Sequence, residues 1–431
     1  MKKKKVMKDK LKKILKKIGC ILGIYVFLIT IFTGIMTWSY SLDNSSIIKN
    51  VSESAQTIEK EGVYPRVIIN NEKAQLDNFT DSWMLTIAMG REEKSPIDQA
   101  MSCYYRISKN AKEKADNLIR IVNGEETELR GYMRYWHGYQ SILRPLLKVF
   151  NYEEIRYINM FCMIGLFIIS SYLIKEKIGT GCAIAFVVSM LMSMIIIVPM
   201  SLQFSSIYYI TLISIVILTL FSERIMKKDL MYIYFFFIGS ITSFFDLLTA
   251  PIMTLGFSLI VYIYLELNNK SIKKNLIEVI SKSFDWSIGY VMTWSGKWIL
   301  AEIITKKSVV NDALNQVLSR VSNKANEVDI TKLTVIMKNI NEYIEGINIK
   351  LIFIIMIVLF IAFMLMKNKN YINMIPTLFI ALYPIICYIL LTNHSFIHFW
   401  FTYRNLAVSC FAILSFAFYA MDPNKFINRI N

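Results

Sequence analysis

Ten blocks of mostly apolar residues limit what this sequence can fold into; most are separated by short polar connectors, and two long segments lie between the others. A helix needs about 20 such residues to cross the ~30 Å hydrocarbon core of a bilayer, and most blocks approach that length. Hydrophobic residues make up 55% of the chain and are concentrated in these blocks, unlike in an ordinary soluble domain. We therefore predict an all-α, polytopic transmembrane helical bundle of about ten spans. The blocks are 18–39, 157–174, 181–199, 207–221, 231–249, 251–267, 284–304, 350–366, 371–391 and 403–420.

The first 17 residues form a basic segment in front of the first block. They contain ten Lys residues and one Asp, and so account for +9 of the net charge of +16. A cationic run beside a span orients that span and binds anionic lipid headgroups. This location favours membrane lipids over nucleic acid as the partner of the charge. The block 18–39 is longer than the ~7–15-residue core of a signal peptide, so we expect an uncleaved first span.

The short connectors predict the orientation of the chain. If the N-terminus is cytoplasmic, every short cytoplasmic connector contains Lys or Arg, whereas the short outer connectors at 200–206, near 250 and at 392–402 contain neither. This is the positive-inside pattern. We therefore predict that both termini are cytoplasmic, which places the long segments 40–156 and 305–349 on the outer side.

This topology divides the chain into parts with different environments. The cytoplasmic connectors are too short for a nucleotide-binding domain, and no G-x-x-x-x-G-K-[ST] loop occurs, which disfavours an ATP-driven pump. The predicted parts are a basic cytoplasmic tail (1–17), the first transmembrane helix (18–39), an extracytoplasmic loop with interfacial helices (40–156), spans two to seven (157–304), an extracytoplasmic amphipathic segment (305–349), and spans eight to ten with a cytoplasmic tail (350–431).

Two acids lie four residues apart in the first long segment. Asp77 and Asp81, in the string DNFTD, suit a site for a divalent cation such as Mg²⁺ or Mn²⁺, or a catalytic base. A helix cap or an Asx turn explains the same acids equally well. Further along, Ser95-Pro96 predicts the start of a helix that continues to about residue 122.

The string TELRGYMRYWHGYQSILRPLLKVF carries basic residues at helical spacing. This spacing predicts a helix in the membrane interface with aromatic residues at headgroup depth. Its polar stripe is either an interfacial anchor or a shelf for a lipid phosphate, because Arg matches phosphate oxygens bidentately. The stripe consists of Arg130, Arg134, His137, Ser141, Arg144 and Lys148.

Ionisable residues also lie near the outer ends of the later blocks, where they are costly and often functional. Asp246 and Lys297 either neutralise each other or take part in a site. His394 and Arg404 either anchor the interface or contact a ligand phosphate. The segment 305–349 has two apolar stripes at helical spacing, which predict a lid over the outer mouth or a surface-lying pair of helices.

The layout resembles the GT-C superfamily of membrane glycosyltransferases, which use polyprenyl-phosphate-linked sugars. The shared features are a large first outer loop bearing acids, a helix leading into the second span through RYIN, and outer-facing polar residues on later spans. The acid closest to the first span, Asp43, lacks an acidic neighbour, which departs from that family's pattern. The strings DNFTD and RYWHGYQSILRPLL also resemble those of poorly characterised polytopic membrane proteins of Gram-positive bacteria.

The resemblance implies an enzyme of the bacterial plasma membrane. It would transfer a sugar from a polyprenyl-phosphate donor to a glycan or lipid acceptor of the cell envelope at the outer leaflet, with membrane lipids and no nucleic acid as further partners. Asp77 or Asp81 would be the catalytic base or would bind a metal. The predicted ligands of the substrate are Arg134, His137, Arg144, Asp246, Lys297, His394 and Arg404.

Three alternatives remain at this level. A polymerase or ligase of lipid-linked glycans needs similar phosphate contacts. A transporter or flippase of polysaccharide or lipid would act without catalysis, although transporters typically have repeated halves and charges at the bilayer midplane. A non-catalytic assembly subunit is the third.

Overall fold

The computed structural model describes residues 2–69, 71–90, 93–110, 114–267, 270–325, 328–345 and 371–421. The described chain is helical almost throughout, which confirms the predicted all-α class. Two short antiparallel pairs provide its strands: β1 (Tyr105–Ser108) with β2 (Thr127–Arg130), and β3 (Lys324–Ala325) with β4 (Val328–Asp329). The predicted block 350–366 lies outside the described residues.

One long helix and several short ones form the first part of the chain. They are α1 (Lys2–Ser41), α2 (Ser45–Glu61), the 3₁₀ turn η1 (Glu72–Ala74), α3 (Asn78–Ala88), α4 (Pro96–Ser102), α5 (Lys114–Val122) and α6 (Gln140–Leu147).

The rest of the described chain forms the helical bundle and the segments packed on it. These are α7 (Tyr152–Lys177), α8 (Thr180–Met192), η2 (Val198–Met200), α9 (Leu202–Lys227), α10 (Met231–Phe245), α11 (Ile252–Tyr262), the π-helical turn η3 (Ile263–Leu267), α12 (Ile272–Thr305), α13 (Val309–Val321), α14 (Lys332–Ile344), η4 (Tyr371–Met374), α16 (Pro376–Ile380), α17 (Tyr383–Leu390), α18 (Thr392–Ile397), α19 (Phe399–Thr402), η5 (Tyr403–Asn405) and α20 (Leu406–Met421).

Five helical segments within the described residues are long and apolar enough to cross a membrane. Three further apolar helices are shorter, namely α8, α10 and α11. The structure therefore supports a membrane protein, while the count of ten spans remains a prediction. The five segments are Ile14–Ser41, Tyr152–Lys177, Leu202–Lys227, Tyr371–Leu390 and Phe399–Met421.

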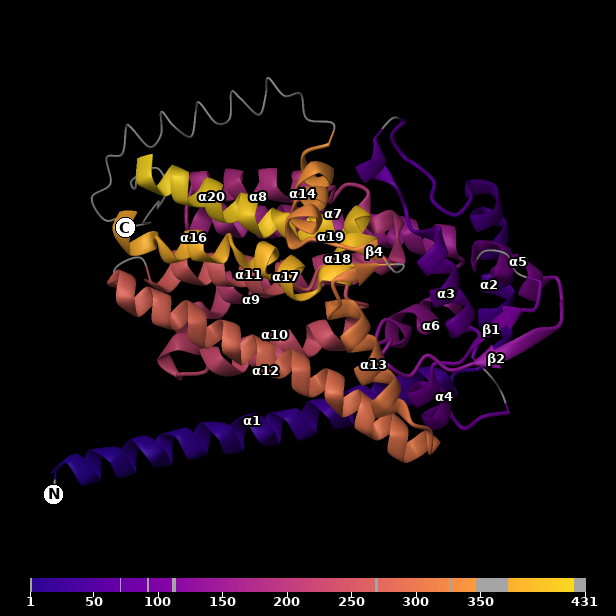
Figure 1. The fold of residues 1–431 in the computed structure, drawn as a ribbon, viewed down its shortest axis with the longest axis horizontal. Coiled ribbons are helices and arrows are strands. Elements are labelled where there is room, and N and C mark those ends of the chain that lie inside the picture. Colours follow the sequence, from indigo (N-terminus) through magenta and orange to yellow (C-terminus); the bar gives the residue numbers. More distant parts are fainter. Residues whose placement is uncertain are drawn as a thin grey trace.

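The elements between α1 and α7 gather at one end of the molecule (Figure 1). The N-terminus of α1 and the end of α20 both lie at the opposite end. A separate apolar core joins α2, α3, α5 and α6 to the first turns of α7 and α9. The segment 40–156 is thus a folded unit with its own core.

The helix predicted to run from Ser95 to about residue 122 is interrupted. Its start is as expected, because Pro96 occupies the first turn and the Ser95 hydroxyl accepts the Asp98 N–H at 3.4 Å. However, α4 ends at Ser102, because Cys103 adopts a left-handed backbone (φ 44°) and strand β1 follows. Side-chain periodicity does not reveal such a turn, since Cys has no special preference for it.

The predicted basic stripe is also not one helix. Arg130 ends strand β2, Arg134 lies in the following turn, and α6 begins only at Gln140. His137 has a positive φ of 52°, which no α-helix contains. Of the stripe, only Ser141 and Arg144 lie on α6, which is therefore shorter than the helix that the stripe predicted.

Helices α10 and α12 cross in very close contact. A Cβ atom on Gly239 would lie 2.0 Å from the Trp286 carbonyl oxygen, and one on Gly289 would lie 2.1 Å from the Phe236 carbonyl oxygen. Small residues at a crossing bring two backbones together, which is the usual way that helices pack where apolar burial adds little.

The predicted apolar stripes of α13 and α14 are exposed only in part. Leu318 and Leu333 are 65% and 68% exposed, whereas Ile330 is buried and Ile340 and Ile344 pack against the main core. Asn339 and Glu342 of α14 are also buried, so α14 places both apolar and polar groups against the rest of the molecule.

Candidate functional site

The first turn of α3 holds both acids of the DNFTD string. Asp77 is the residue before the helix, and one of its oxygens accepts the Thr80 N–H at 3.0 Å. The helix-cap interpretation of Asp77 is therefore confirmed. The other oxygen, Oδ2, is buried and has no hydrogen-bond partner, so the cap uses only half of this carboxylate.

Asp81 lies one turn later and its carboxylate is fully used. Its oxygens accept the backbone N–H groups of Leu202 and Gln203 at 2.8 and 3.0 Å, and the hydroxyls of Tyr152 and Ser201 at 2.5 and 3.3 Å. A carboxylate at the N-terminus of α9 satisfies free N–H groups and complements the helix dipole. Asp81 thus joins α3 to α9, which leaves little capacity for a metal shared with Asp77.

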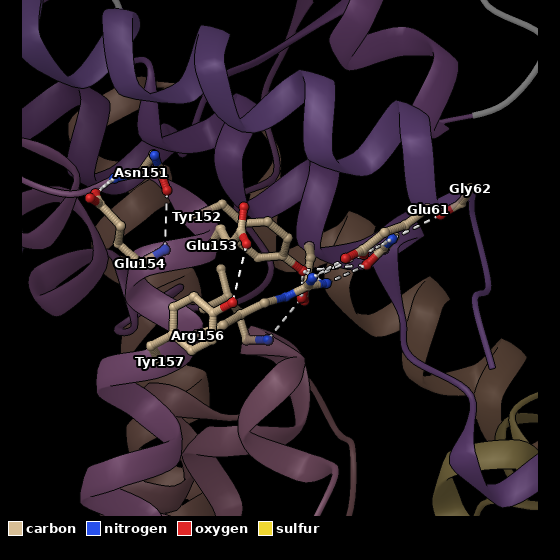
Figure 2. Close-up of polar contacts among 11 residues, drawn as sticks. Glu61, Gly62, Asn151, Tyr152, Glu153, Glu154, Arg156 and Tyr157 are labelled. Carbon is tan, nitrogen blue, oxygen red and sulfur yellow. Dashed lines mark hydrogen bonds and ion pairs between the residues drawn. The ribbon is translucent and has the colours of Figure 1, made fainter. Parts of the chain in front are cut away.

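Arg156 holds the surroundings of Asp81 in place (Figure 2). Its guanidinium donates to both oxygens of Glu61 at 2.7 and 2.9 Å, and to Asn78 and the Tyr152 hydroxyl at 2.8 and 2.7 Å. Figure 2 shows Arg156 between Glu61 and Tyr152, on the helix that begins at the capping box of Asn151. This buried set fixes α2, α3 and α7 relative to one another.

Arg404 is the second charged group near Asp77. It is fully buried in η5, and its guanidinium carbon lies 4.0 Å from the centre of the Phe204 ring on α9. Its Nη1 donates to the Trp400 carbonyl oxygen at 3.3 Å, whereas Nε and Nη2 have no hydrogen-bond partner within the described chain. Two unpartnered nitrogens on a buried guanidinium are costly unless a ligand accepts hydrogen bonds from them.

We use the name Arg404 pocket for a set of side chains and not for a cavity: Arg404 and the titratable groups that are close enough to interact with its charge. It joins residues from the first long segment, from α9, from α14 and from the last predicted span, which sequence distance does not suggest. Besides Arg404, its members are Lys73, Asp77, Tyr208, Glu342 and Tyr403.

The charges in this pocket are unusual for their burial. Burial, together with the charge of the neighbouring Asp81, raises the pKa of Asp77 to about 7, although the hydrogen bonds from Thr80 and the charge of Arg404 oppose this rise. Burial likewise raises the pKa of Glu342 to about 7. A carboxyl group with a pKa near neutrality can take or give a proton under physiological conditions.

Arg144 is buried as deeply as Arg404 but all of its nitrogens are used. It donates to the Ser39 carbonyl at the end of α1, to the Ala88 carbonyl at the end of α3, and to the Asn44 side chain. Carbonyl groups at helix C-termini have no partner within the helix and attract cations. The structure therefore places Arg144 as a clamp between helix ends.

His137 and Arg134 lie apart from the Arg404 pocket. The His137 ring nitrogens bond to the Tyr139 hydroxyl at 2.8 Å and the Tyr132 carbonyl at 3.0 Å. Burial lowers the pKa of His137 to about 3, so the ring is neutral. Arg134 forms an ion pair with Asp312 of α13 at 2.9 Å.

Lys297 and Asp246 do not neutralise each other within the described residues. The Lys297 ammonium donates to the Ala100 and Met101 carbonyls at 3.0 and 2.9 Å, so it caps α4. Asp246 ends α10 and accepts the Thr249 N–H at 2.9 Å, while its second oxygen is buried without a partner.

His394 bonds to two neighbours rather than to Arg404. One ring nitrogen contacts the Arg320 guanidinium, and the other lies 2.9 Å from the Leu248 carbonyl oxygen. Burial and the charge of Arg320 lower the pKa of His394 well below its usual value. Of the nine predicted site residues, the structure brings Asp77, Asp81 and Arg404 together and distributes the others over separate contacts.

The sequence analysis did not select Lys73 and Glu342. Glu342 lies three residues after Asn339 on α14, between Ile340 and Ile344 in the sequence. A charged residue on a predicted surface helix usually points to solvent, so the pattern gave no reason to single out Glu342. Only the structure shows that Glu342 is buried.

A groove of about 810 Å³ lies between α6, α7, α9 and α10. Its lining is almost entirely apolar, with Asn159, Ser205 and Tyr209 among its few polar residues. By helical spacing the groove follows one face of α9, whereas Phe204 and Tyr208 lie on the opposite face beside Arg404. The first turns of α9 therefore separate the groove from the Arg404 pocket.

No protein-family model, curated protein or solved structure matches this chain.

Proposed function

We propose that this protein is an inverting membrane glycosyltransferase that uses a polyprenyl-phosphate-linked sugar and modifies a cell-envelope acceptor outside the cytoplasm. The supporting observation is that the Arg404 pocket combines an acid with a free oxygen and an arginine with two nitrogens that have no hydrogen-bond partner. Glycosyl transfer needs a base that takes the proton of the acceptor hydroxyl and a cationic group that binds the phosphate of the donor.

Asp77 Oδ2 takes the proton of the acceptor hydroxyl as the acceptor oxygen bonds to the anomeric carbon. The bond between that carbon and the phosphate oxygen breaks, and its electron pair stays on the polyprenyl phosphate. Arg404 binds the departing phosphate by donating hydrogen bonds from Nε and Nη2, which have no other partner. The pKa of Asp77, about 7, suits a base that works near neutral pH.

Asp81 has a positioning role in this proposal. Its four hydrogen bonds attach α3 to the start of α9, and Phe204 at the start of α9 lies against Arg404. The two reacting functions are therefore held by a rigid connection, as a preorganised site requires. The apolar groove on the other side of α9 offers a surface on which a polyprenyl chain can lie.

The test uses membranes containing the full chain and a panel of radiolabelled polyprenyl-phosphate sugars. Asp77→Asn is expected to lower transfer by about 10²–10⁴-fold, the usual contribution of a general base. Asp43→Asn is the control, because Asp43 is exposed on the same segment and lies closer to the first span. Full transfer by Asp77→Asn would refute the proposed base.

Two results would select other functions. Transfer from a pyrophosphate-linked oligosaccharide, with none from the phosphate-linked sugars, would indicate a polymerase or ligase. Movement of a lipid-linked sugar across proteoliposomes without covalent change would indicate a flippase.

A further inference from the structure

Three glutamates meet beside the Arg404 pocket. Glu72 lies in η1 of the first long segment, and Glu342 and Glu345 lie at the end of α14 in the second. One carboxylate oxygen from each lies within 4.8 Å of the other two. Residues about 270 positions apart in the chain thus place their acids at one point.

Glu342 is buried, Glu345 is half-buried and Glu72 is exposed, but both Glu342 and Glu345 have a buried oxygen without a partner. Glu342 is only 6% exposed, and its Oε1 is buried without a hydrogen-bond partner. Oε2 of Glu345 is also buried and unpartnered. Clustered carboxylates repel each other, and buried oxygens without a hydrogen-bond partner are expected to bind a water molecule or an ion.

The positive groups nearby do not complete this cluster. Lys73 donates to the Tyr343 carbonyl at 3.2 Å and forms no ion pair with the three acids within the described residues. Arg66 contacts Glu72 at 3.2 Å, on the exposed side. The inner oxygens of Glu342 and Glu345 therefore remain available.

We propose that Glu72, Glu342 and Glu345 bind one hard divalent cation, Mg²⁺ or Mn²⁺. Carboxylate oxygens are the ligands that these ions prefer, and water fills the remaining positions of their octahedral shell. The ion connects the two long segments that are predicted to lie outside. It also differs from the predicted site at Asp77 and Asp81, where Asp81 is already saturated.

The proposed ion would also change the electrostatic surroundings of Arg404. Tyr403 lies close enough to Arg404, Glu342 and Glu345 to interact with the charges of all three, so the proposed ion lies near Arg404. The Tyr403 hydroxyl and Oε1 of Gln203 are further buried groups without a partner. The cation adds positive charge next to Arg404, where an anionic ligand gains most from it.

The test is a Mn²⁺ titration of the EDTA-treated full chain in nanodiscs, followed by the electron paramagnetic resonance signal of free Mn²⁺. Wild type is expected to bind one Mn²⁺ per chain, and Mg²⁺ is expected to displace it. Glu342→Gln and Glu345→Gln are each expected to weaken Mn²⁺ binding at least about tenfold. Glu53→Gln, at a more exposed glutamate of α2, is the matched control and should bind as wild type does.

Two outcomes would overturn the site: no bound Mn²⁺ in wild type at millimolar concentration, or equal binding by wild type and both variants. If Glu342→Gln does not fold, Glu345→Gln and Glu72→Gln at the less buried positions still decide the question. The measurement is independent of glycosyl transfer. Asp77→Asn should bind Mn²⁺ normally, so failure of the proposed reaction and failure of the metal site are distinguishable.

Discussion

Arg144 and Arg404 are both fully buried, yet their surroundings differ completely. Arg144 donates from all three nitrogens to helix ends and a side chain. Arg404 donates from one nitrogen and leaves two without a partner. A buried charge is retained either because its contacts hold elements together or because a ligand completes them. The comparison therefore separates a structural region around Arg144 from a candidate binding region around Arg404.

Asp81 and Asp77 differ in the same way as Arg144 and Arg404. Asp81 accepts four hydrogen bonds from α7, α9 and the residue preceding α9, whereas Asp77 accepts one and keeps a free oxygen. The two are four residues apart on the same helix turn. Their spacing in the sequence gives no reason to distinguish the two acids, but their hydrogen-bond partners in the folded chain differ.

The largest expected effect is on stability at Arg144. Arg144→Met should lower the free energy of unfolding by about 3–5 kcal/mol, because it leaves buried carbonyls of α1 and α3 without their donor. Arg404→Met should be neutral or stabilising, because it removes a charge that the protein does not satisfy. Denaturant titration of the purified full chain in one detergent measures both. Equal destabilisation by the two changes would contradict the comparison.

The next effect concerns ligand binding. Arg404→Met should weaken binding of polyprenyl phosphate at least about tenfold, since charged hydrogen bonds contribute about 1.5–3 kcal/mol each. Native mass spectrometry of the protein in nanodiscs measures the bound lipid. Polyprenol without phosphate is the control and should bind both proteins equally weakly. Unchanged phosphate-lipid binding by Arg404→Met would remove Arg404 from the proposed site.

A comparable effect on stability is expected at Asp81. Asp81→Asn should cost about 1–3 kcal/mol, because the amide presents N–H groups to donors at the start of α9. Transfer by the folded variant should remain within about tenfold of wild type, in contrast to Asp77→Asn. Unfolding and transfer assays on the same preparations test this. A larger loss of transfer for Asp81→Asn than for Asp77→Asn would exchange the roles of the two acids.

The smallest effect is on the pH profile. A base with a pKa of about 7 is mostly protonated below that value. Transfer should therefore rise about tenfold per pH unit below 7 and level off above it. Because burial raises the pKa of Asp77 in the folded state, the contribution of this group to stability should fall as pH rises from about 4 to 7. Asp77→Asn should abolish this stability slope, and an unchanged slope would show that Asp77 is not its source.

The apolar blocks predicted the helical class and most helix positions. Helices α7 and α9 cover their predicted blocks, and Asn151 caps α7 as its sequence N-Y-E-E favours. These features are local, so nearby residues determine them. By contrast, the block 231–249 becomes α10 and ends at Phe245, because Asp246 leaves the helix. Whether such short helices cross the bilayer depends on their packing, which the block length does not specify.

The candidate site was predictable only in part. Arg404 was selected because a charge near an apolar block is costly, and Asp77 because it lies four residues from a second acid; neither argument needs a structure. The interpretation of Arg134, His137 and Arg144 as one stripe required an uninterrupted helix, and the turn at His137 removes it. A positive φ at a residue that is not Gly leaves no reliable trace in side-chain spacing.

The sequence by itself determined that the chain is helical and apolar enough for a membrane, and it identified some of the buried charged residues but not Lys73 or Glu342. Tertiary structure alone decided which charges are satisfied. Arg144 and Asp81 are used because helix ends from distant parts of the chain present their carbonyl and N–H groups to them. Arg404 packs against the Phe204 ring, which supplies no acceptor for Nε and Nη2, and Oδ2 of Asp77 likewise has no partner. Hydrogen bonding is short-ranged and directional, so it depends on positions that only the folded chain defines.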